Sequence, residues 1–231
     1  MQCLNCKEEF EGKFCPNCGQ KANTTNLSFG TLVTDVVNGF TTIDRGIFFN
    51  IYHLTVAPGR MINEYLDGKR KGVFNPISYA ILIVSVYLLV ESFVDWPSKN
   101  ADNVEKATYS FGLAIGRNIR DYFKFVWLFS IVPMSLVSRA FFSKRNTVEH
   151  MAVHSFSIGH ATIAAIIGLF FKVPIVTNVF VLIVMIIVTF SAYRKYEHIA
   201  ISFASTLFIV IIGAITPVLI AALMVLIQNN G

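Results

Sequence analysis

The chain has 231 residues, of which 54% are hydrophobic and 14% charged, and its formal net charge is +5. A soluble domain typically carries about 25% charged residues, so the composition argues against a soluble globular protein and favours lipid as the main surroundings. The cations stand mostly beside hydrophobic runs, so they indicate orientation and contact with anionic lipid, and no partner of the nucleic-acid class is expected.

All four cysteines lie in the first 18 residues, as two C-x-x-C pairs with eight residues between them: Cys3, Cys6, Cys15 and Cys18. Each pair suits a tight turn that presents two thiolates to one ion, and Gly19 allows the left-handed backbone that closes such a turn. Four sulfurs are typical of a closed tetrahedral site, so we predict a zinc ribbon or knuckle over residues 1–20 with one structural Zn²⁺. The alternatives are a disulfide pair, a redox dithiol and an iron site of rubredoxin type.

The predicted knuckle has the character of a structural clip or docking surface, because four thiolates leave no open position for catalysis. The first residues lack the apolar core of a signal peptide. Paired thiols without an export signal favour a reducing compartment, which places this end of the chain in the cytosol.

A polar stretch at 21–27 is predicted to be a linker, followed at 28–75 by short amphipathic juxtamembrane helices. Ser28 suits the N-cap of the first helix, Thr42 or Asp44 that of the second, and Pro58 the first turn of a third that Gly68 closes. None of these helices is long and apolar enough to span a membrane. They either lie in the headgroup plane or pack under the spans, and the alternative is a small soluble helical subdomain.

Residues 76–231 are predicted to form an all-α membrane bundle of about five transmembrane helices, because a crossing needs about 20 apolar residues. Pro174 suits the first turn of the fourth span, and Pro133 and Pro217 predict kinks inside the second and fifth. The short link before the fourth span makes it an antiparallel neighbour of the third. The predicted spans are 76–94, 123–142, 151–171, 173–193 and 199–227.

Loop charges predict the orientation of this multi-pass bundle. The connections on the side of the N-terminus carry nine Lys and Arg residues, and those on the other side carry six. The positive-inside rule therefore places the N-terminus in the cytosol and the C-terminus outside a cytoplasmic (inner) membrane.

The third span combines small and ionisable residues. Ala161/Ala165 and Ala164/Gly168 are small-xxx-small pairs, which predict close helix packing at the centre of the bundle. The same span begins with Glu149 and carries three histidines, His150, His154 and His160.

Glu149, His150, His154 and His160 are the candidate catalytic residues, since ionisable groups at membrane depth often have a function. His150 and His154 are four residues apart on one helix face, a spacing that allows two imidazoles on one metal. A structural polar cluster at the membrane boundary is the simpler interpretation, with Glu149 capping the helix start.

Lys69, Arg70 and Lys71 stand directly before the first span and form the candidate site for lipid phosphates or other anions. The alternative is that these three cations only anchor the chain and set its topology.

Four features occur in order: the knuckle ending Cys18-Gly19-Gln20, the segment Ala57-Pro58-Gly59-Arg60, the motif Tyr65-x-x-Gly68-Lys69-Arg70 leading to Asn75-Pro76, and Glu149-His150 before a histidine-bearing span. Together they resemble an uncharacterised family of bacterial integral membrane proteins, a domain of unknown function. The resemblance implies the same architecture over nearly the whole chain and implies no activity.

We therefore expect a non-enzymatic membrane protein. Its knuckle would dock a protein partner or support self-association, and its bundle would anchor, sense, assemble or form a pore. A transporter or lipid-handling protein that binds anionic headgroups is the first alternative. An intramembrane metalloenzyme that uses Glu149, His150 and His154, with His198 as a further ligand, is the second.

Overall fold

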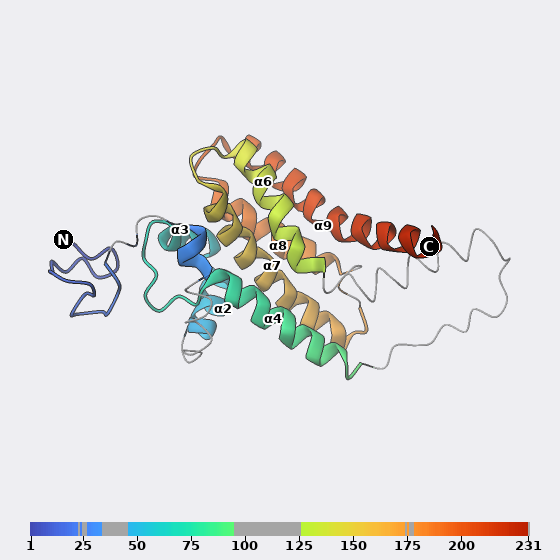
Figure 1. Ribbon diagram of the computed structural model, residues 1–231, viewed down its shortest axis with the longest axis horizontal. Helices are drawn as coiled ribbons and strands as arrows, with labels where there is room; N and C mark the ends of the chain where they lie inside the picture. The colour runs from blue at the N-terminus through green and yellow to red at the C-terminus, as the bar shows by residue number, and fades with distance from the viewer. Residues whose placement is uncertain are drawn as a thin grey trace.

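The computed structural model describes residues 1–22, 24, 27–33, 46–94, 126–173, 175 and 178–230. Beyond the N-terminal knuckle the described chain is helical (Figure 1): α2 (Gly46–Val56), α3 (Pro58–Leu66), α4 (Pro76–Glu91), η1 (Trp127–Ser130), α6 (Ile131–Phe141), α7 (Thr147–Phe170), α8 (Val179–Tyr193) and α9 (Ile199–Asn230). The caps predicted at Thr42 and Asp44, the first residues of the predicted second span and its preceding loop lie outside the described residues.

The helix α7 occupies the centre of the bundle, as its small residues predicted. It packs against α4, α6 and α8, while α9 packs against α6 and α8. A Cβ added at Gly159 would lie 2.8 Å from the ring of Tyr79 and 3.1 Å from the Cα of Ala80, so α4 and α7 meet as closely as a glycine allows.

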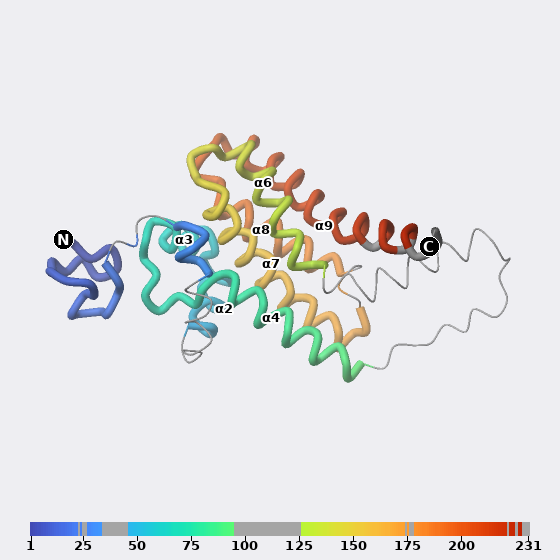
Figure 2. Tube along the Cα trace, viewed as in Figure 1, coloured from blue at the N-terminus to red at the C-terminus, as the bar shows by residue number. Residues whose placement is uncertain are grey.

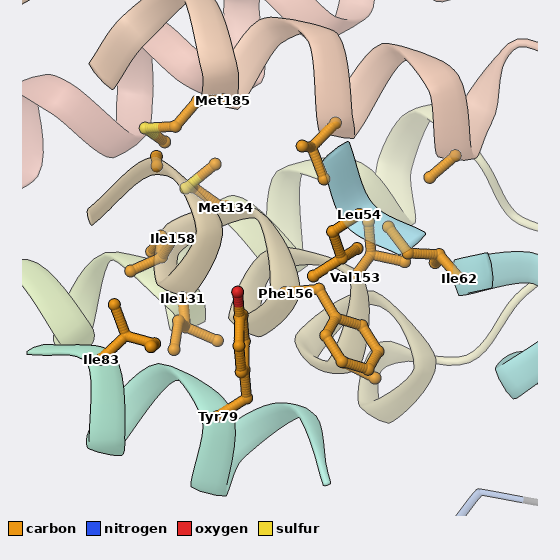
Figure 3. Close-up of a cluster of buried hydrophobic side chains, with 14 of the residues drawn as sticks. Leu54, Ile62, Tyr79, Ile83, Ile131, Met134, Val153, Phe156, Ile158 and Met185 are labelled. Carbon is orange, nitrogen blue, oxygen red and sulfur yellow. The ribbon is translucent and has the colours of Figure 1, made fainter. Parts of the chain in front are cut away.

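The main core fills the space around α7. Tyr79 and Ile83 of α4 face Phe156 and Ile158 of α7, and Leu54 of α2 belongs to the same cluster (Figure 3). All these side chains are less than 9% exposed. The helix α2 therefore shares one core with the bundle.

Hydrogen bonds show that α7 and α8 run antiparallel, as predicted. Ser157 bonds to Thr189 at 3.0 Å, and Asn178 donates to the backbone oxygen of Ala164 at 3.2 Å, so positions later in α7 meet positions earlier in α8. The helix in the predicted fourth span begins later than expected: α8 starts at Val179, with Asn178 as its N-cap. The Asn178 side chain accepts from the Phe180 amide and caps the helix there. Pro174, predicted for the first turn, lies outside the described residues.

The third predicted span starts earlier than expected. Asn146 and Glu149 form a capping box, in which each side chain accepts the backbone N–H of the other residue. This reciprocal cap begins α7 at Thr147. Glu149 thus has the capping role proposed from the sequence.

The second predicted span is divided into η1 and α6. Pro133 lies in the first turn of α6, where its missing N–H costs no helical hydrogen bond. Pro217, by contrast, lies inside the continuous helix α9.

In the part of the chain that the structure describes, two helices, α7 and α9, are long and apolar enough to cross a membrane. The other three predicted spans correspond to shorter apolar segments, Pro76–Glu91, Trp127–Phe141 and Val179–Tyr193.

The helix boundaries predicted at Ser28, Pro58 and Gly68 agree with the structure. The Ser28 side chain accepts from the Thr31 amide, Pro58 begins α3, and Gly68 follows α3 with a φ of +98°. The linker prediction needs one correction: Leu27 is 2% exposed and belongs to the main core. Burial of its apolar side chain is favourable, so Leu27 packs against the core and does not remain in a solvent-exposed linker.

Candidate metal centre and its docking loop

Two equivalent turns build the knuckle. The Lys7 amide bonds to the Cys3 oxygen, and the Gly19 amide bonds to the Cys15 oxygen. Lys7 and Gly19 both take a left-handed backbone, with φ of 67° and 70°. This conformation was predicted at Gly19 but not at Lys7, because a lysine rarely adopts it.

The four thiols converge on one point. Every pair of Sγ atoms lies within 4.8 Å, with Cys3 and Cys18 at 3.6 Å and Cys6 and Cys15 at 3.5 Å. Sulfurs around a tetrahedral zinc with bonds of about 2.3 Å lie about 3.8 Å apart, whereas a disulfide bond is about 2.04 Å long. The cysteines are free and their spacing fits a metal ion held between the two turns.

The turn also prepares a thiolate. The Cys6 backbone N–H points at Cys3 and is the main reason why the pKa of the Cys3 thiol falls to about 6. A metal needs its cysteine ligands deprotonated. Backbone amides directed at sulfur are thus the local feature that suits this site to a cation.

The knuckle docks on the loop between α3 and α4. Oε1 of Gln20 accepts from the amides of Arg70 and Lys71 at 3.0 and 3.2 Å. Nε2 of Gln20 donates to Thr24, whose hydroxyl donates to the Gly68 oxygen at 3.0 Å. Gln20 is 4% exposed, so one buried amide side chain joins the candidate metal centre to this loop. Figure 2 shows the knuckle at one end of the molecule, beside the loop between α3 and α4.

Gly68 is required where the loop meets the knuckle. A Cβ there would lie 2.5 Å from the Leu4 side chain and 3.1 Å from the Thr24 oxygen, and its positive φ disfavours other residues. The Tyr65-x-x-Gly68-Lys69-Arg70 motif is therefore a docking platform for the knuckle.

The three candidate anion-binding residues have different surroundings. Lys69 is ion-paired with Glu64 at 3.0 Å. Arg70 lies over the ring of Tyr65 at 5.5 Å. Lys71 is exposed.

An ion-pair network joins three connections at the same end of the bundle. Arg145 bonds to Asp67 and, at 3.0 Å, to Glu149, while Lys195 lies 3.7 Å from Asp67. Burial acts to lower the pKa of Arg145, but Asp67, Tyr196 and Glu149 outweigh it and raise the pKa above its ordinary value. Arg145 thus stays charged while it holds the loops together.

The candidate histidines His150 and His154 are buried in this part of the bundle and meet Tyr193 of α8. His150 Nδ1 lies 2.7 Å from the Tyr193 hydroxyl, and His150 Nε2 lies 3.1 Å from the Phe142 oxygen. A carbonyl oxygen can only accept, so Nε2 carries the proton and the hydroxyl donates to Nδ1. Both ring nitrogens of His150 are therefore occupied.

His154 and His160 have separate partners. His154 Nε2 lies 2.6 Å from Ser138 Oγ, and its Nδ1 is buried without a hydrogen-bond partner in the described structure. His160 bridges Tyr79 of α4 and Thr55 of α2, at 3.2 and 3.3 Å. His160 therefore joins three helices and lies apart from the pair around Tyr193.

Within the described ranges, the four thiols are the one group of His, Cys, Asp and Glu side chains that converges closely enough to hold a metal. Glu149 is engaged in its cap and in the ion pair with Arg145. His198 lies near its own backbone, with the Ala200 amide 3.4 Å from Nδ1.

Sequence reasoning missed several residues that organise the site. Gln20 had one signal, its place directly after Cys18-Gly19. Asp67, Tyr193 and Tyr196 had none, since each contributes through contacts with distant segments.

Comparison with known proteins adds one match. No curated protein and no solved structure matches the chain. Residues 44–88, which hold α2, α3, the docking loop and most of α4, match the model of a protein family of unknown function, DUF3667.

Proposed function

We propose that the protein is a non-enzymatic, multi-pass inner-membrane protein whose cytosolic zinc knuckle is clamped to the membrane-proximal loop and forms a docking module for a protein partner. The helical bundle is its anchor and assembly scaffold. The observation that carries this proposal is the gathering of the cationic connections and the knuckle at one end of a bundle with an apolar exterior.

The outer surface supports a lipid environment. Only 24% of the most apolar stretch of α9 is buried. Large exposed apolar patches are rare on soluble monomers. Exposed apolar side chains cover the outer face of α9, at Phe208, Ile211, Ile215 and Leu219, and lie on other helices at Leu89, Phe129, Leu136, Ile183 and Ile187.

The polar end supports the orientation. The loops before α4, before α7 and before α9 meet through Asp67, Arg145 and Lys195. The positive-inside rule assigns such a cationic end to the cytosol. The C-terminus of α9 lies at the far end from the knuckle (Figure 1), as an odd number of crossings requires. Five crossings are proposed, with α4, η1–α6 and α8 as the shorter ones.

Zinc is the proposed ion because the sulfur spacing fits its bond length and four thiolates suit its tetrahedral preference. The reducing cytosol keeps the thiols available for it.

Protease accessibility tests the orientation. A tag before Met1 should be cleaved in inverted inner-membrane vesicles and protected in right-side-out vesicles, with the opposite result for a tag after α9. A protein that stays soluble and monomeric without detergent, or an N-terminal tag outside, would exclude the proposal.

Metal content separates the proposal from a metalloenzyme. We expect one zinc per purified chain, lost in Cys3→Ser/Cys15→Ser and unchanged in His150→Ala/His154→Ala. Two equivalents that fall to one in the histidine variant would instead favour catalysis in the bundle.

Lipid handling is the second candidate function, because a cavity with exposed cations adjoins the knuckle.

A further inference from the structure

A cavity of about 180 Å³ lies between the knuckle, α2, α3 and the docking loop. A single water needs only about 10–15 Å³, so the space suits a small polyatomic group. The residues that line it are Asn5, Phe49, His53, Arg60, Met61, Glu64, Lys69, Lys71 and Val73. It is separate from the thiol site and from the histidines of α7.

The lining is cationic. It contains Arg60, Lys69 and Lys71 against the single carboxylate of Glu64. Glu64 is bound to Lys69 at 3.0 Å, so these two charges offset each other. Among the described residues, neither Arg60 nor Lys71 has an acidic partner.

We propose that this cavity binds a phosphate-bearing anion through Arg60 and Lys71, with the metal-held knuckle closing one side through Asn5. A guanidinium offers parallel N–H donors that match phosphate oxygens, and a lysine adds a mobile point charge. Asn5 adds a side-chain amide that can donate to a further oxygen.

The knuckle holds the site in place. Gln20 binds the Lys71 amide, and a Cβ at Gly19 would lie 3.3 Å from Lys71 Nζ, so the ammonium group lies against the second turn. Asn5 lies between Cys3 and Cys6 in the first turn. Binding of the anion therefore depends on the metal that folds both turns.

The phosphate can belong to a lipid or be free in solution. Phe49 and Met61 line the cavity, and α2 exposes Phe48, Tyr52 and Val56. This apolar face gives acyl chains a place beside the cavity if α2 lies at the membrane surface, a point that rests on the proposed function.

Calorimetric titration of the full-length zinc-loaded protein tests the site at fixed ionic strength. One arm titrates inorganic phosphate into protein in phosphatidylcholine nanodiscs. The other measures binding to vesicles of phosphatidylcholine with and without phosphatidic acid. Saturable binding in the first arm assigns a soluble anion, and binding confined to the second assigns a lipid headgroup.

Two variants and one control decide the outcome. Arg60→Gln and Lys71→Gln should each weaken binding by about tenfold or more, because a charge-assisted hydrogen bond is lost. Lys13→Gln removes an exposed knuckle cation outside the cavity and should leave binding unchanged. Should Arg60→Gln not fold, the exposed Lys71 variant alone carries the test.

The site is excluded if neither probe binds saturably, or if Lys13→Gln weakens binding as much as the cavity variants do. Each variant must retain one zinc and its membrane integration. A protein that passes these two checks but binds neither inorganic phosphate nor phosphatidic acid overturns the inference and leaves the proposed function intact.

Discussion

Gln20 is the residue that links the knuckle to the loop between α3 and α4. Its carboxamide oxygen accepts two consecutive backbone amides, those of Arg70 and Lys71, and its nitrogen donates to Thr24. Because its hydrogen bonds join the knuckle to the loop, we expect the loss of this side chain to weaken docking more than it destabilises the knuckle or the bundle.

Replacing Gln20 with alanine should loosen the knuckle without releasing its metal. Each hydrogen bond contributes about 0.5–1.5 kcal/mol. Gln20 makes two bonds to the loop, to the amides of Arg70 and Lys71, so docking should weaken by about 1–3 kcal/mol. Limited trypsin digestion should cleave faster at Lys69–Lys71 while zinc content stays at one. Gln2→Ala, an exposed change on the knuckle, is the control, and equal cleavage of both variants would contradict the junction.

Glu149 combines two roles that substitutions separate. Glutamine can still accept the Asn146 amide in a capping box, so Glu149→Gln loses only the charge opposite Arg145. Glu149→Ala loses the cap as well, which costs about 1 kcal/mol more. Thermal unfolding in detergent should rank wild type, glutamine and alanine in that order, and equal midpoints for the two variants would refute the cap.

Among the elements, α7 is the one on which the bundle depends. It contacts α4, α6 and α8, and its polar side chains reach Ser138, Tyr193 and Tyr79 on those three helices. The hydrogen bonds of the histidines can form only while the helices lie close together, and Gly159 permits that close approach between α4 and α7.

Gly159→Ala should destabilise the bundle even though alanine is the better helix former. The new Cβ meets the Tyr79 ring and the Ala80 backbone, and such overpacking costs about 1–3 kcal/mol. A lower unfolding midpoint in detergent is the expected result. Gly30→Ala, where a Cβ meets nothing within 4 Å, should not lower the midpoint. A stabilised Gly159 variant would show that α4 has room to move.

At the scale of the whole molecule, the knuckle and the bundle have separate cores. The knuckle buries Cys3, Phe10 and Cys15, whereas the main core runs from Leu27 to the helices. The knuckle is too small to fold on burial alone, so the proposed metal would have to supply its stability.

Chelation should therefore unfold the knuckle and spare the bundle. Hydrogen exchange should become faster over residues 1–22. It should also become faster at the amides of Arg70 and Lys71, because they lose their hydrogen bonds to Gln20. The amides of α7 should stay protected. Restoring zinc should reverse the change. Loss of protection throughout α7 would mean that the two parts fold as one unit.

The sequence by itself determined the features that local spacing controls. Two C-x-x-C pairs bring four sulfurs together, Pro58 and Gly68 bound α3, and the small residues of α7 predict a central helix, because turns and helices set the distances between near neighbours. The membrane crossings, their orientation and the zinc remain predictions from composition and charge. Only the tertiary structure decided that Gln20 holds the Lys71 amide, that Asp67 meets Arg145 and that Tyr193 meets His150. These pairs are separated by 51, 78 and 43 residues, and no local rule brings such positions together until the helices have packed.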